Sequence, residues 1–171
     1  MAQLLDRLQG GDRRSIGRVA EVVAEVLSNP DRFGELIAGM QHPDPVVRMR
    51  AADAAEKVSA DHPDYLSRYK DELLHQIAQS TQQEVRWHVA QMLPRLALSA
   101  DEQTVAVALL YGYLNDRSAI VQTFALDALA TFVQRDATLR PEVVRLRDQA
   151  QSAERAAVRS HAKKLLAILK R

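Results

Sequence analysis

The sequence contains no cysteine, which excludes disulfides, thiolate nucleophiles and cysteine-ligated metals. Its six glycines are scattered, and no glycine-rich phosphate-binding loop is present. Aromatic residues make up only 5% of the chain, so few aromatic side chains are available to stack on nucleic-acid bases. No apolar run approaches the roughly 18 residues of a membrane span, and residues 1–10 lack the pattern of a signal peptide. We therefore expect a cytoplasmic protein.

The composition that is present is typical of a globular domain, with 47% hydrophobic and 26% charged residues. A length of 171 residues is near that of one domain and allows a core to form without disulfides or metals. The net charge of +1 is unevenly distributed, because residues 138–171 hold nine lysines and arginines against three acidic residues. This basic C-terminal end is either a solvated terminal helix or a contact for phosphate or an acidic protein.

Four segments of the sequence share one pattern, in which a valine is followed four residues later by alanine or valine. The segments are Val47-Arg48-Met49-Arg50-Ala51, Val85-Arg86-Trp87-His88-Val89, Val121-Gln122-Thr123-Phe124-Ala125 and Val158-Arg159-Ser160-His161-Ala162. Their first valines are separated by 38, 36 and 37 residues, which is within the range of two-helix repeat units. The sequence therefore predicts four related helical hairpins.

Further apolar residues stand eight and eleven positions after each of these valines. They are Ala55 and Val58, Leu93 and Leu96, Leu129 and Phe132, and Leu166 and Leu169. At 100° per residue these offsets fall on one face of a helix, so each segment is expected to form an amphipathic helix. We place the repeats at residues 30–61, 62–98, 99–135 and 136–171, within a single domain covering residues 1–171.

Residues 1–29 are expected to form one or two additional helices that cap the open apolar face of the first repeat. Their apolar positions are Ile16, Val19, Val22, Val23, Val26 and Leu27. In the first repeat, Asp44 followed by Pro45 suits an N-cap and a first helical position. Other breaks are expected at Asn29-Pro30, His62-Pro63, Asn115-Asp116 and Leu139-Arg140-Pro141.

Pro94 lies inside the predicted second helix of the second repeat. Proline has no N–H to donate within a helix, so Pro94 should kink or shorten this helix. No stretch of the chain predicts a strand. The expected fold class is therefore all-α.

The stretch from Asp44 to Ala51 reads Asp-Pro-x-Val-Arg-x-x-Ala, and it resembles the start of the second helix in the HEAT repeat family. The resemblance extends over roughly residues 30–171. It implies an armadillo-like, right-handed α-solenoid whose second helices line a concave, usually protein-binding surface. HEAT units carry no catalytic motif, so the resemblance implies neither catalytic residues nor a cofactor.

Residues opposite the apolar stripe should form the exposed row of this surface. Two and six positions after the valines, the row contains Met49, Asp53, Trp87, Gln91, Thr123 and Asp127. Trp87 is the only tryptophan, and tryptophan is enriched among the residues that dominate binding energy at interfaces. Trp87 is thus either the centre of a binding surface or a peripheral core residue folded over a neighbouring helix.

Basic side chains flank the predicted second helices. They are Arg48, Arg50, Arg86, His88 and Arg159, followed by Lys163 and Lys164. In a stack of hairpins such arginines bridge neighbouring units through carboxylates or loop carbonyls, which would make their role structural. They could instead contact phosphates, as in HEAT-like DNA glycosylases that share this architecture.

The sequence offers little sign of chemistry. Its five histidines show no spacing of two on one helix face beside a carboxylate, so no metal site is predicted. The leading expectation is a scaffold or adaptor that is not an enzyme and that binds a protein partner through its concave face. Nucleic-acid binding is the second alternative, and a HEAT-like lyase or chaperone is the third.

Overall fold

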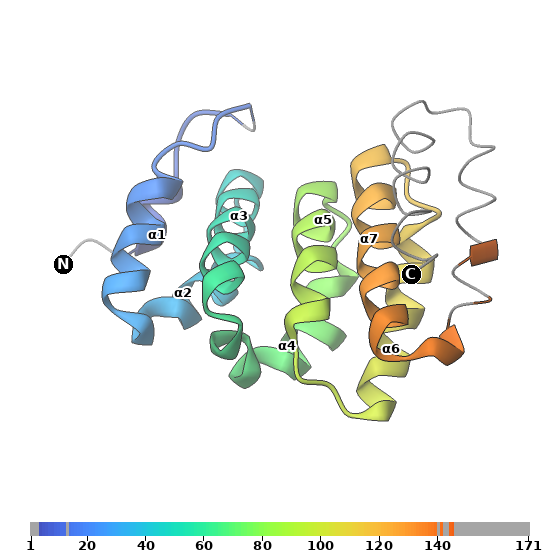
Figure 1. The fold of residues 1–171 in the computed structure, drawn as a ribbon. Coiled ribbons are helices and arrows are strands. Elements are labelled where there is room, and N and C mark those ends of the chain that lie inside the picture. The colour runs from blue at the N-terminus through green and yellow to red at the C-terminus, as the bar shows by residue number, and fades with distance from the viewer. Residues whose placement is uncertain (1–3, 13, 140, 142–143, 146–171) are drawn as a thin grey trace. The chain divides into compact units, whose positions relative to one another are not determined.

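The computed structural model describes residues 4–12, 14–139, 141 and 144–145. All regular structure in these ranges is helical, as predicted, and they contain no strand (Figure 1). The α-helices are α1 (Val19–Ser28), α2 (Phe33–Gly39), α3 (Pro45–Asp61), α4 (Lys70–His75), α5 (Gln83–Met92), α6 (Ala100–Tyr113) and α7 (Ala119–Arg135). Short 3-10 helices accompany them: η1 (Leu4–Leu8), η2 (Pro30–Arg32), η3 (Pro63–Tyr69), η4 (Ile77–Gln79), η5 (Leu93–Arg95) and η6 (Ala137–Leu139).

The chain forms two compact units, Met1–Ala97 and Leu98–Arg171. In the first unit, α3 lies between α1 and α5 and also packs against α2 (Figure 1). In the second unit, α6 and α7 pack against each other. None of the helices in the described ranges combines the length and hydropathy needed to cross a membrane.

The apolar stripe predicted from the repeated sequence pattern is buried in the three segments of that pattern that the structure describes. The stripe residues are Val47, Ala51, Ala55 and Val58 on α3, Val85, Val89, Leu93 and Leu96 on and after α5, and Val121, Ala125, Leu129 and Phe132 on α7, and none is more than 3% exposed. The stripe of the fourth repeat, from Val158 onward, lies outside the described residues.

Helix boundaries follow the predicted local signals. The Asp44 carboxylate accepts the N–H of Val46 at 2.8 Å and caps α3, whose first residue is Pro45. α1 ends just before Asn29-Pro30. α5 ends at Met92 and continues as the 3-10 helix η5 around Pro94, so this proline shortens the helix as expected.

Within residues 1–29, where cap helices were expected, the structure has the helices η1 and α1, with Leu4, Leu8 and Val22 buried. Two residues expected in their apolar face are instead exposed, Ile16 at 55% and Leu27 at 37%. Ile16 precedes α1, and Leu27 lies about 100° around the helix from the buried Val26, so neither faces the core.

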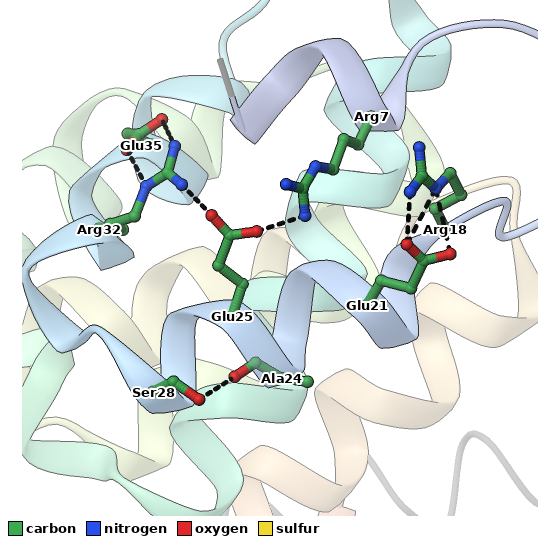
Figure 2. Close-up of polar contacts among 8 residues, drawn as sticks. All are labelled: Arg7, Arg18, Glu21, Ala24, Glu25, Ser28, Arg32 and Glu35. Carbon is green, nitrogen blue, oxygen red and sulfur yellow. Dashed lines mark hydrogen bonds and ion pairs between the residues drawn. The ribbon is translucent and has the colours of Figure 1, made fainter. Parts of the chain in front are cut away.

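Charged side chains connect η1 and α1 to η2 and α2. Arg7 from η1 and Arg32 from η2 each pair with one carboxylate oxygen of Glu25 on α1 (Figure 2). Arg32 also donates to Glu35 of α2 at 2.7 Å and lowers the pKa of that carboxyl. Four successive elements thus share one partly buried ion network, which fixes the path of the chain around α1.

Candidate functional site

The helices α3, α5 and α7 are each preceded by a loop built in the same way. In each loop a side chain accepts a hydrogen bond from the backbone N–H two residues later. The pairs are His42 Nδ1 with Asp44 N at 3.1 Å, Ser80 Oγ with Gln82 N at 3.2 Å, and Asp116 Oδ1 with Ser118 N at 2.7 Å. Such local bonds turn the chain immediately before a helix starts.

A second hydrogen bond also recurs at these loops. The donor is the side chain one residue after the repeat valine. It donates to the backbone carbonyl of the residue six positions before the donor itself. The pairs are Arg48 with His42 at 2.8 Å, Arg86 with Ser80 at 2.5 Å, and Gln122 with Asp116 at 2.7 Å. Glutamine in the third repeat thus makes the same bond as arginine in the other two.

Arg48 and Arg86 therefore have a structural role, because each binds a carbonyl of the loop before its own helix. Arg48 in addition donates to Gln82 Oε1 at 2.8 Å, and Gln82 donates to the carbonyl of Pro45 at 2.9 Å. The residues before α5 are therefore bonded to the first turns of α3, which holds the two neighbouring helices in register.

Arg50 is 3% exposed and reaches away from its helix into the N-terminal loop. Its guanidinium donates to the backbone carbonyls of Leu8, Gln9, Gly10, Asp12 and Ser15, at 2.7 to 3.4 Å. Gly17 has a positive φ of 56°, and a Cβ there would lie 2.8 Å from Arg50 Cζ. Arg50 therefore holds this loop in place. Arg50 was predicted to be an exposed basic contact, but it is buried because the loop covers it.

His88 lies on α5 opposite Asp53 of α3, and it is 8% exposed. His88 Nε2 is 3.9 Å from Asp53 Oδ1, too far for a hydrogen bond, and Nδ1 is buried with no hydrogen-bond partner among the described residues. Asp53 accepts from Lys57 at 2.7 Å. Burial lowers the pKa of His88 to about 4, although the Asp53 and Glu56 carboxylates act in the opposite direction.

A further bridge between repeats was not anticipated from the sequence. Arg95 pairs with the Glu56 carboxylate and donates to the Glu56 carbonyl at 2.7 Å and to Ser59 Oγ at 2.9 Å. Glu56 and Ser59 belong to α3, whereas Arg95 follows α5. Only the basic character of Arg95 was visible in the sequence, and its acceptors lie 36 and 39 residues away.

The predicted exposed row is partly accessible. Met49 is only 7% exposed, which differs from the expected solvent-facing position, because α3 has neighbours on both sides. Trp87, Gln91, Thr123 and Asp127 are half-buried. Gln91 donates to the Trp87 carbonyl at 3.2 Å, and the Trp87 ring meets His88 edge-on at 5.6 Å.

The first unit therefore brings Trp87, His88 and Asp53 together across α5 and α3. Thr123 and Asp127 lie on α7 in the second unit. The remaining predicted basic contacts, Arg159, Lys163 and Lys164, lie outside the described residues.

One recess in the first unit was not predicted from the sequence. It lies between η2 and η3 and is lined by Pro30, Asp31, Phe33, Asp64, Tyr65, Arg68 and Tyr69. The only available signal was the pair Tyr65 and Tyr69, four residues apart beside Asp64. Across the described ranges, no group of three or more histidine or acidic side chains is arranged to hold a metal ion.

Comparisons with known proteins identify a fold and no family. No family model matches the sequence, and no curated protein matches it. Among solved structures, the chain is similar to an engineered protein whose crystal structure comes from the Northeast Structural Genomics Consortium. The match has a TM-score of 0.64 and 16% sequence identity, and covers 98% of this chain and 79% of the engineered one. At this identity the likeness is one of helical fold alone.

Proposed function

We propose that this protein is a non-catalytic scaffold or adaptor, a HEAT-like α-solenoid that binds a protein partner through the second helices of its hairpins. The observation that carries the proposal is the loop construction repeated before α3, α5 and α7. Two hydrogen bonds recur in each loop despite different side chains, which supports three equivalent hairpins. Stacks of equivalent hairpins form extended surfaces that serve mainly in binding.

The proposed contact centre is Trp87 on α5. Its ring is half-buried and packs edge-on against His88, so it is held in place without being fully enclosed. Gln91 of α5 donates to the Trp87 carbonyl, and Asp53 of α3 lies opposite the adjacent His88; both side chains are half-buried. An anchored aromatic ring with polar groups around it is typical of the residues that dominate interface energy.

The hydrogen bonds that the arginines make within the protein favour a protein partner over a nucleic acid. Arg48, Arg50 and Arg86 all donate to backbone carbonyls. Phosphate binding by these guanidiniums would require breaking those bonds, whereas phosphate contacts supply most of the affinity for nucleic acids. Nucleic-acid binding therefore has no structural observation in its favour within the described residues.

The proposal is tested by comparing capture by the unaltered protein with capture by Trp87→Ala. Each immobilised protein is exposed to a lysate of its source organism, and the retained proteins are quantified by mass spectrometry. We expect at least one protein to lose binding roughly 30-fold with Trp87→Ala, the effect of about 2 kcal/mol at a hot spot. The melting temperatures of the two proteins should be close, because a half-buried ring contributes less buried area to the core than a fully buried one.

Leu27→Ala is the matched control, because Leu27 is an exposed apolar side chain of the same unit, on α1. It should leave capture unchanged. A Trp87→Ala protein that melts several degrees lower yet keeps full capture would contradict the proposal and identify Trp87 as a packing residue. Recovery of DNA or RNA in place of a protein, abolished by nuclease, would instead support the nucleic-acid alternative.

A further inference from the structure

The recess between η2 and η3 has a volume of about 230 Å³. Small-molecule pockets for drug-sized ligands span roughly 300 to 1,000 Å³, so this recess is the size of a single side chain and not of a whole cofactor. Its two walls come from equivalent places in successive hairpins, since η2 precedes α2 and η3 precedes α4. All of its lining residues belong to the first unit.

Three aromatic rings line the recess and contact one another. Phe33, which is 2% exposed, meets Tyr65 edge-on at 5.7 Å and Tyr69 at 5.9 Å. His62 stacks on Tyr65 at 4.9 Å and fixes that ring from outside the recess lining. Gly34 lets the Tyr69 hydroxyl approach the backbone of α2, because a Cβ at this position would collide with that oxygen.

The charged side chains of the recess are exposed and have no ion-pair partner among the described residues. Asp31 and Asp64 contribute carboxylates from opposite walls, and Arg68 contributes one guanidinium. None of the three forms an ion pair or a side-chain hydrogen bond with any residue that the structure describes. This differs from the ion network around Glu25, where every charged group has a partner.

We propose that this recess receives the cationic side chain of a lysine or arginine carried by a protein partner. Aromatic faces attract cations through the ring quadrupole, and the attraction is strongest where water is displaced. The two carboxylates supply charge-assisted hydrogen bonds to the same cation. Arg68 is then available for a carbonyl or carboxylate of the partner segment that carries the basic residue.

The charge balance of the lining selects among occupants. An anion would meet one guanidinium but two carboxylates, and like charges at short range raise the free energy of binding. A neutral aliphatic side chain would gain nothing from the charge of the two carboxylates. A cation is therefore the occupant that satisfies the rings and both carboxylates together.

This inference depends on the proposed function only in taking the partner to be a protein, and it concerns a surface that does not include Trp87. Its test uses small probes, so its outcome is separate from that of the capture experiment. The probes are the N-acetyl methylamides of arginine, lysine, citrulline and glutamate. Their binding is followed by NMR through the ring resonances of Tyr65 and Tyr69 in the full chain.

We expect saturable shifts of both tyrosine rings with the arginine and lysine probes. Citrulline has nearly the shape of arginine without its charge, and it should bind about tenfold more weakly, the loss of one charge-assisted interaction. Asp64→Asn should weaken the cationic probes by a similar factor. Asp71→Asn is the matched control, since Asp71 is an exposed carboxylate of α4 outside the recess, and it should change nothing.

Three kinds of result would overturn the inference. The first is the absence of saturable shifts at probe concentrations in the tens of millimolar, with helical circular dichroism showing that the protein is folded. The second is equal binding of citrulline and arginine, or equal loss in Asp64→Asn and Asp71→Asn. The third is preferential binding of the glutamate probe that disappears in Arg68→Gln, which would make the recess an anion site.

Discussion

Arg50 and His88 occupy the same position in successive repeats, three residues after the first valine, yet burial affects them differently. A guanidinium stays charged, so it is stable inside a protein only where acceptors surround it. Arg50 has those acceptors in the carbonyls of the N-terminal loop. An imidazole can lose its charge, and His88 does so, because its burial lowers its pKa to about 4.

The depressed pKa of His88 predicts a loss of stability at mildly acidic pH. The unfolded chain takes up a proton at the ordinary histidine pKa of 6.5, whereas the folded chain does so only near 4. As the pH falls between these values the unfolded state binds more protons, so the free energy of unfolding decreases, by on the order of 3 kcal/mol. Urea denaturation at a series of pH values from 7 to 4 measures this slope.

His88→Gln removes the titrating group and should flatten the stability profile between pH 6.5 and about 4.5, above the range where carboxylates titrate. His75→Gln is the control, since His75 is an exposed histidine at the end of α4, and it should keep the full slope. An unchanged profile in His88→Gln would show that other groups cause the acid sensitivity.

At the scale of elements, the loops before the repeated helices are specified by side chains on the helices that follow them. Arg48, Arg86 and Gln122 each hold a loop carbonyl six residues upstream. The N-terminal loop uses a longer-range version of this contact, because Arg50 binds carbonyls 35 to 42 residues before it in the chain. One side chain therefore orders a whole segment.

Replacing that side chain should release the segment. Arg50→Ala leaves five carbonyls without their donor. A hydrogen bond to a charged group contributes about 1.5 to 3 kcal/mol, but water can solvate the carbonyls once the loop is released, so we expect a net loss of roughly 3 kcal/mol of unfolding free energy, about the value of one or two such bonds. Proteolytic cleavage within residues 8–17 should also become faster. Chemical denaturation and limited proteolysis followed by mass spectrometry measure the two effects.

Arg50→Lys retains the charge but lacks the planar fork of five donors, so its loss should be intermediate. Arg18→Ala removes an exposed ion pair with Glu21 at the start of α1 and should change stability by less than about 0.5 kcal/mol. Equal effects of Arg18→Ala and Arg50→Ala would contradict the role assigned to Arg50.

At the scale of the molecule, the apolar stripes of three repeats provide much of the core. Leu93 shows how much one stripe residue contributes to the free energy of unfolding. Leu93 is fully buried immediately after α5. Leu93→Ala should lower the free energy of unfolding by roughly 2 to 5 kcal/mol, because the truncation removes buried area and leaves a cavity. Circular dichroism during chemical denaturation measures the change and should show a predominantly helical spectrum.

The exposed Leu27 supplies the comparison for this measurement. Leu27→Ala should stay within about 0.5 kcal/mol of the unaltered protein, as surface substitutions do. A loss below about 1 kcal/mol for Leu93→Ala would contradict the assignment of the buried face, since a leucine truncated in a packed core costs more than this.

The sequence alone determined the features that depend on neighbours within a few residues. The spacing of Val85 and Val89 defined a buried helix face because a helix repeats every 3.6 residues. Asp44 and Pro45 defined a helix start, and Pro94 defined a helix end, because capping and the missing proline N–H act locally. Such signals predicted the helical class and the helix boundaries that capping residues or prolines mark.

Only the tertiary structure decided which side chains outside the apolar stripe are covered and what they bind. Arg50 and Met49 read as surface residues, but a loop covers the first and neighbouring helices enclose the second. The recess at Tyr65 and Tyr69 exists because two segments about 30 residues apart in the chain lie side by side. Burial and hydrogen-bond partners at such separations depend on how elements pack, and the helical period carries no information about that packing.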